Sequence, residues 1–280
     1  MVDRLTSVDL LNQDLRGEHQ AIVHYLTHAW TVIRSFGGAV EAIARDEMRH
    51  FKWLSHAIVA LGGMPDLSPP DPLPLLSGAE ALDYDISAEE EAIRQYRDHQ
   101  KTIDDHRLQV LLERIVVDEE DHRRQFMILR EQWQQWPGQA VVEGPQLTQE
   151  SVHPFQAALK EEYEGILTAL LQSFFARPHY DIGLRAEDRA IDLMKHLGWL
   201  GEALGAQGIP VTWSLPETHN GHESRGWLQE ILNWSEEHMP HLAPLVARAI
   251  QHQRLDAQMA RLGGWTVGPY PEGGYREWMS

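Results

Sequence analysis

The sequence contains no cysteine among its 280 residues. Disulfide bonds, thiolate metal sites and iron–sulfur clusters are therefore excluded, because each of them needs cysteine sulfur. The chain also lacks an apolar run long enough to cross a bilayer, and its first nine residues contain no apolar signal core. We therefore expect a cytoplasmic protein without a membrane partner.

Basic residues are scarce as well. The 24 Lys and Arg residues are outnumbered by 42 Asp and Glu residues, and the formal net charge is -18. Such an excess disfavours binding to nucleic acid or to an anionic membrane surface, and it attracts cations. The composition therefore predicts metal ions rather than nucleic acid as partners.

One pattern of acidic residues and histidine occurs twice. Glu18 leads the pair Ala-Ile and is followed by Tyr25, and Glu89 leads the same phrase before Tyr96. In each copy, the glutamate of a Glu-x-x-His pair follows the lone glutamate by 29 or 30 residues. The two pairs are Glu47 with His50 and Glu119 with His122.

Helix geometry explains why this spacing matters. Residues three apart lie on one face of a helix, so each Glu-x-x-His pair can hold one metal ion while the lone glutamates come from two other helices. Four carboxylates and two imidazoles are the ligand set of a carboxylate-bridged two-metal centre in a four-helix bundle. We predict Glu47 and Glu119 as the bridging carboxylates. The predicted metal ligands, which are also the predicted catalytic residues, are Glu18, Glu47, His50, Glu89, Glu119 and His122.

Some roles stay open at this point. Glu90 is an alternative to Glu89, because Glu90 fits the 29-residue spacing whereas Glu89 shares a helical face with Ile93 and Tyr96. Tyr25 and Tyr96 lie two turns from the lone glutamates, where they hydrogen-bond a ligand, relay an electron or satisfy a partner in the core.

Other polar residues near the pattern have weaker signals. Asp46 and Asp118 precede the bridging glutamates and either orient a ligating histidine or form part of a solvated face. The other histidines form two sets. The first set falls off the ligand face, and we interpret it as surface or packing residues. The second set has no carboxylates at matching helical spacing. The first set is His19, His24, His28 and His56, and the second is His219, His222, His238 and His241.

Residues 8–133 resemble the ferritin-like superfamily, and most closely the bacterioferritin and rubrerythrin-like di-iron proteins. The stretch from Asp46 to His50 is similar to the metal-binding motif of that family, whereas the second copy has Asp121 where arginine is expected. The resemblance implies a cofactor of two iron ions, with manganese as a variant, and oxidation of Fe(II) by dioxygen or peroxide. Two alternatives are an oxygenase or peroxidase acting on a small substrate and a metal-stabilised binding or scaffold protein without catalysis.

The predicted fold is all-α, with tandem ferritin-like four-helix bundles. In the first bundle we expect helices over 9–35, 40–61, 87–103 and 105–133, with Gly37-Gly38 ending the first helix. The crossover between the second and third helices, 64–85, contains five prolines and is predicted to be non-helical.

The second half resembles a divergent copy of the first. His196 and Trp199 repeat the spacing of His50 and Trp53, and we expect helices over 155–175 and 187–205 and a further helical region over 227–262. Leu193 and Ala249 stand where ligand glutamates are expected, and Glu162 alone is retained, so we predict a structural role for this half. The predicted domains are a metal-binding bundle over 1–136, a linker over 137–151, a degenerate bundle over 152–264 and an extended arm over 265–280.

The fused second bundle also bears on assembly. It would occlude surfaces through which single-bundle ferritin subunits pack, so we expect a monomer or small homo-oligomer rather than a 24-subunit cage.

Overall fold

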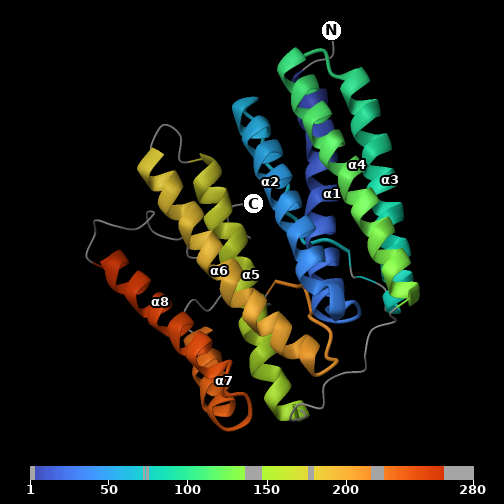
Figure 1. Ribbon diagram of the computed structural model, residues 1–280. Coiled ribbons are helices and arrows are strands. Elements are labelled where there is room, and N and C mark those ends of the chain that lie inside the picture. The colour runs from blue at the N-terminus through green and yellow to red at the C-terminus, as the bar shows by residue number, and fades with distance from the viewer. Residues whose placement is uncertain are drawn as a thin grey trace. The chain divides into compact units, whose positions relative to one another are not determined.

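The computed structural model describes residues 4–71, 73, 76–135, 147–175, 180–215 and 224–261. All regular structure in these ranges is helical, which confirms the all-α prediction (Figure 1). The chain divides into two compact units, Met1–Ala140 and Val141–Ser280. None of the helices in the described ranges is long and apolar enough to cross a membrane.

The first unit is a four-helix bundle made of two helical hairpins. One hairpin joins α1 (Arg4–Trp30) to α2 (Gly37–Ala60), and the other joins α3 (Gly78–Thr102) to α4 (His106–Gln135). The most extensive contacts run within each hairpin, and smaller ones join α1 to α3 and α2 to α4 (Figure 1).

Side-chain contacts give the helix directions. Asp14 contacts His99 while His28 contacts Asp85, so α1 and α3 are antiparallel. Because α1 and α2 are joined by a short turn and also run antiparallel, α2 and α3 are parallel and a long crossover must connect them. This crossover between the second and third helices was expected from the sequence.

The start of α3 differs from the prediction. The helix begins at Gly78 rather than near Ser87, so the expectation of a non-helical segment is wrong for residues 78–85. All five prolines precede the helix, and Ser77 forms a capping box in which its hydroxyl accepts from the Glu80 N–H and the Glu80 carboxylate accepts from the Ser77 N–H. The earlier start places Asp85 on the buried face of α3.

The turn between α1 and α2 also differs. A short 3-10 turn, Arg34–Phe36, follows α1, and Gly37 begins α2 instead of ending the preceding helix. A Cβ at Gly37 would lie 2.9 Å from the carbonyl oxygen of Ala29. Glycine is therefore required there because the two helices approach closely, and it does not act as a helix stop.

The second unit contains α5 (Gln149–Phe175), α6 (Tyr180–Ala206), α7 (Ser224–His238) and α8 (Ala243–Arg261). Its helices pair as in the first unit: α5 with α6, α7 with α8, α5 with α7 and α6 with α8.

The starts of two helices in the second unit need correction. The helical region predicted over 227–262 consists of two helices, α7 and α8, which are separated between His238 and Ala243, where Pro240 lies. Both α5 and α6 begin several residues earlier than predicted, so the end of the predicted linker is helical. The rest of that linker, 137–146, and the predicted arm, 265–280, lie outside the described residues.

Candidate metal centre

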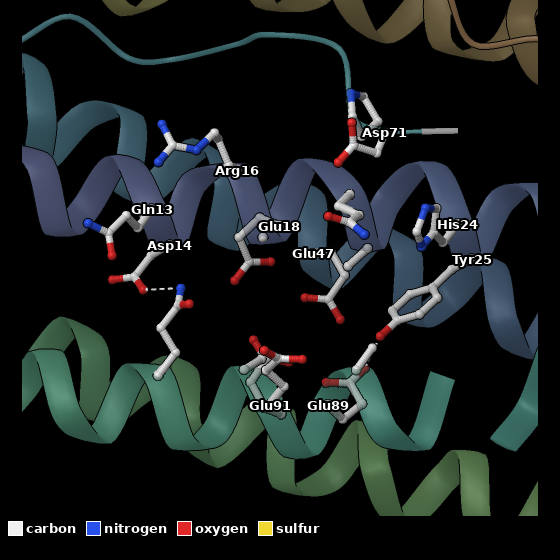
Figure 2. Close-up of a pocket in the computed structure, with 18 of the residues that line it drawn as sticks. Gln13, Asp14, Arg16, Glu18, His24, Tyr25, Glu47, Asp71, Glu89 and Glu91 are labelled. Carbon is white, nitrogen blue, oxygen red and sulfur yellow. Dashed lines mark hydrogen bonds between the residues drawn. The ribbon is translucent and has the colours of Figure 1, made fainter. Parts of the chain in front are cut away.

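The six predicted ligands meet in the interior of the first unit. Helices α1 and α3 supply one lone glutamate each, and helices α2 and α4 supply one Glu-x-x-His pair each. All six side chains are buried, and Glu18 is the most accessible at 4 %. Figure 2 shows Glu18, Glu47 and Glu89 directed toward one another across the space between the helices. Buried carboxylates are costly unless charge or hydrogen bonds compensate them, so this arrangement needs cationic partners.

The six residues form two overlapping groups of four. In each group one donor atom per residue lies within 4.8 Å of all the others. The first group is Glu18, Glu47, His50 and Glu119, and the second is Glu47, Glu89, Glu119 and His122. Since Glu47 and Glu119 belong to both groups, they are placed to bridge two cations.

The structure also separates the two candidates on α3. Glu89 is 2 % exposed and belongs to the second group, whereas Glu90 is exposed and lies 3.5 Å from the guanidinium of Arg123. The helical face, rather than the 29-residue spacing, therefore selects the residue that enters the cluster.

Each histidine presents Nδ1 to the carboxylates. His50 Nδ1 lies 3.0 Å from Glu47 and 3.1 Å from Glu119, and His122 Nδ1 lies 2.8 Å and 3.0 Å from the same two residues. The opposite nitrogens face aspartates: His50 Nε2 is 3.0 Å from Asp118, and His122 Nε2 is 3.5 Å from Asp46. Each aspartate thus contacts the histidine of the other hairpin, where it fixes the ring orientation and keeps Nδ1 free to bind a cation.

Two buried tyrosines hold the lone glutamates. The Tyr25 hydroxyl donates to Glu89 Oε1 over 2.7 Å, and the Tyr96 hydroxyl donates to Glu18. Burial and the adjacent carboxylates raise the pKa of both tyrosines well above the ordinary value, so both stay protonated donors. Of the roles left open for these tyrosines, the hydrogen bond to a predicted ligand is the one that the structure contains.

The electrostatics of the cluster favour cation binding. Burial, together with the charges of Glu47 and Glu119, raises the pKa of Glu18 and Glu89 well above the usual range. Although burial opposes it, contact with Glu119 and Glu47 raises the pKa of His122 to about 11. These shifts show that four neighbouring carboxylates need positive charge, which divalent ions supply more strongly than protonated imidazoles.

Three carboxylate oxygens of the cluster are buried without a hydrogen bond among the described residues, and two of them, Glu47 Oε1 and Glu119 Oε1, lie within 3.1 Å of a histidine nitrogen. Glu18 Oε2 is buried without a hydrogen-bond partner among the described residues, and it lies 3.6 Å from His50 Nδ1. A buried carboxylate oxygen beside other donors is a position that a hard cation would satisfy. The donor set therefore fits two first-row divalent ions.

Sequence reasoning missed two further buried pairs. His99 lies 2.8 Å from Asp14, and His28 lies 2.8 Å from Asp85. Both aspartates precede a ligand glutamate by one turn, and both histidines follow a tyrosine by three residues. Each aspartate and each histidine therefore occupies the same place in its copy of the glutamate phrase. This regularity is visible in the sequence. His28, together with His19 and His24, is a buried residue and not a surface residue.

A cavity of about 720 Å³ lies between α1 and α3 and reaches the cluster (Figure 2). Four of the ligand glutamates line it, and residues from Ser68 to Asp71 of the crossover contribute to its wall. The candidate centre is therefore accessible to small molecules from this side.

The second unit has a related but different cluster. His196 Nδ1 lies 3.4 Å from Glu162, His196 Nε2 lies 3.3 Å from His252, and Gln253 donates to Glu162 over 2.8 Å. Leu193 and Ala249 are buried where the first unit has Glu47 and Glu119. Within the described ranges, the two groups of the first unit are the only sets of donors close enough to hold a metal ion.

The remaining predicted histidines do not form a site in the described residues. His238 is exposed and contacts the carbonyl of Trp234, and His241 is also exposed. His219 and His222 lie outside the described residues.

Comparison with known proteins agrees with this geometry. A family model described as a ferritin-like domain matches residues 8–135. Searches of curated proteins and of solved structures found no match. The matched residues contain all four helices that converge on the cluster, and the N-terminal half of this chain is therefore a ferritin-like domain.

Proposed function

We propose that the N-terminal unit binds two iron ions and oxidises Fe(II) with dioxygen or peroxide. The observation that carries the proposal is the sharing of Glu47 and Glu119 between two four-donor groups. Iron bound there would supply the electron transfers that reduce dioxygen or peroxide. Manganese is a variant, since hard oxygen and imidazole donors discriminate weakly among first-row ions.

The protein residues have separable roles in this proposal. The four glutamates contribute four negative charges, which balance two divalent ions. Tyr25 and Tyr96 restrain the lone glutamates from the opposite helix, and Asp46 and Asp118 keep the imidazoles oriented. Because the six ligand residues and both tyrosines are buried, whereas Asp46 and Asp118 are partly exposed, water reaches the carboxylates mainly through the cavity.

Aerobic addition of Fe(II) to the metal-free protein tests the proposal. We expect saturable oxidation near two irons per chain, followed by near-ultraviolet absorbance and oxygen consumption. Glu47→Ala removes a shared ligand and should abolish the saturable phase. Glu90→Ala is the matched control, because Glu90 is an exposed neighbour of Glu89 and should leave the reaction unchanged. Slow or absent oxidation by the folded protein would favour a metal-stabilised scaffold instead.

A second candidate function is oxidation or oxygenation of a small substrate. The cavity that opens onto four ligand glutamates favours it, because oxidation of Fe(II) alone needs only a path for ions and oxygen. Oxygen uptake stimulated by an organic compound would support this candidate.

We further propose that the chain is a monomer or small oligomer and does not form a cage. Light scattering coupled to size exclusion tests this. A particle near 24 chains would overturn it.

A further inference from the structure

The wall of the cavity keeps negative charge beyond that of the metal ligands. Two divalent ions would balance the four glutamates, which leaves Asp14, Asp71 and Glu91 against Arg16. Arg16 is already paired with Asp66 at 2.7 Å. The cavity therefore has a surplus of negative charge even with the centre loaded.

Asp14 is the most informative of these residues. It is 1 % exposed, and its Oδ1 accepts from His99 at 2.8 Å and from Gln95 at 2.9 Å. Its Oδ2 has no hydrogen-bond partner among the described residues, and Figure 2 shows the side chain at one end of the cavity. A buried carboxylate oxygen without a hydrogen bond is destabilising, so a donor from a ligand is the expected partner.

The other end of the cavity offers a second acceptor. His24 is 3 % exposed, and its hydrogen bond to the Asp71 backbone leaves Nε2 without a partner. Burial lowers the pKa of His24 to about 4, so the ring is neutral and Nε2 carries a lone pair. Asp14 and His24 are ten residues apart on α1, which corresponds to about 15 Å along the helix.

The size of the cavity distinguishes an organic ligand from an ion in transit. A metal ion with six waters occupies about 180 Å³, at roughly 30 Å³ per water. The cavity measures about 720 Å³, which is within the range of roughly 300–1,000 Å³ found for small-molecule sites. An ion alone would leave most of this space unfilled.

We infer that the cavity binds a linear organic diamine, with one ammonium group at Asp14, the other at His24 and the carbon chain passing the ligands Glu18 and Glu89. The two ends both accept hydrogen bonds, and the wall between them is negatively charged, so a molecule with a donor at each end fits both. This inference names the class of substrate for the second candidate function. Binding of the diamine does not depend on that function, but its oxidation would.

Calorimetry with 1,8-diaminooctane as the probe tests the inference. The protein is loaded with Zn(II), which occupies the ligands without redox chemistry. We expect one molecule to bind per chain and 1,8-octanediol to bind at least tenfold more weakly. Asp14→Asn should weaken diamine binding at least tenfold, whereas Asp98→Asn, on the exposed face of α3, should not change it.

A further variant protects the test against misfolding. Glu91 is exposed at the cavity, so Glu91→Gln should fold normally and weaken diamine binding two- to threefold. The inference would be overturned if the diol bound as tightly as the diamine, or if Glu91→Gln and folded Asp14→Asn bound the diamine as the unmodified protein does. Binding of a third Zn(II) that excludes the diamine would also overturn it. Because binding is measured without iron, a chain that binds the diamine but does not oxidise Fe(II) would refute only the proposed oxidation.

Discussion

The two units share a pattern of helix contacts but differ in what fills the centre. In both, a histidine of the second helix faces a histidine of the fourth, with ring centroids 5.8 Å apart for His50 and His122 and 5.5 Å apart for His196 and His252. A tryptophan three residues after the first histidine contacts it in each unit. The two histidine positions are therefore compatible with a centre that has lost its bridging carboxylates.

The carboxylates make the difference. In the second unit, Leu193 packs so closely on Gly165 that a Cβ at that glycine would lie 3.0 Å from the leucine side chain. Glu162 is satisfied by Gln253 and His196, so one carboxylate is compensated without a cation. Four clustered carboxylates require compensating positive charge, whereas one carboxylate with two protein partners needs none beyond those partners.

The largest expected effect that separates the units concerns heat stability with metal present. His122→Ala should lower the melting temperature of the Zn-loaded first unit by roughly 10 °C, since ligand loss removes about 3–4 kcal/mol of metal-linked stability. The decrease should be smaller in metal-free protein. Differential scanning calorimetry with and without Zn(II) measures both.

His252→Ala is the matched variant in the second unit. Its effect on melting should be the same with and without Zn(II), because no donor set among the described residues of that unit is close enough to hold an ion. A metal-dependent difference for His252→Ala, or none for His122→Ala, would break the comparison.

A smaller effect is expected from pH. The raised pKa of His122 stabilises the metal-free fold fully below the unfolded value near 6.5, and this contribution is lost as pH rises toward about 11. The raised pKa of Glu18 and Glu89 acts in the same direction, because their ionised forms are disfavoured in the fold. The metal-free first unit should therefore melt at a lower temperature at pH 9 than at pH 6.5.

Metal should reverse this trend. Ligands bind cations in their deprotonated forms, so the stabilisation by Zn(II) should grow between pH 6 and pH 9. Melting curves at four pH values, with Zn(II) and with chelator, test the sign. Parallel pH profiles in the two conditions would contradict a proton-linked site.

The smallest effect concerns the α3 cap. Ser77→Ala removes the hydroxyl that accepts from Glu80 and should cost about 1 kcal/mol. Only the transition of the first unit should shift, by a few degrees. Chemical denaturation followed at two wavelengths measures it.

The sequence indicated which six side chains meet in the first unit because helical spacing translates directly into a shared face. Glu47 with His50, and Glu119 with His122, needed only that rule. The buried pairs of Asp14 with His99 and of Asp85 with His28 were missed because they join residues distant in sequence, and because the α3 start was placed too late for Asp85. Gly37 was misread, since glycine in a tight helix approach and glycine at a helix end look alike in sequence.

The cavity was not predictable from spacing. It depends on the crossover wall near Ser68 and on side-chain packing between α1 and α3. Local sequence patterns indicate which face of its helix a residue occupies, but they do not indicate the distance between the facing sides of two helices.

The crosswise contacts between hairpins bear on biosynthesis. Tyr96 restrains a glutamate of the first hairpin, and Asp118 orients a histidine there, so the first hairpin alone holds neither in place. A nascent chain on the ribosome consequently cannot complete the cluster of four glutamates and two histidines until α4, which carries Glu119 and His122, has emerged.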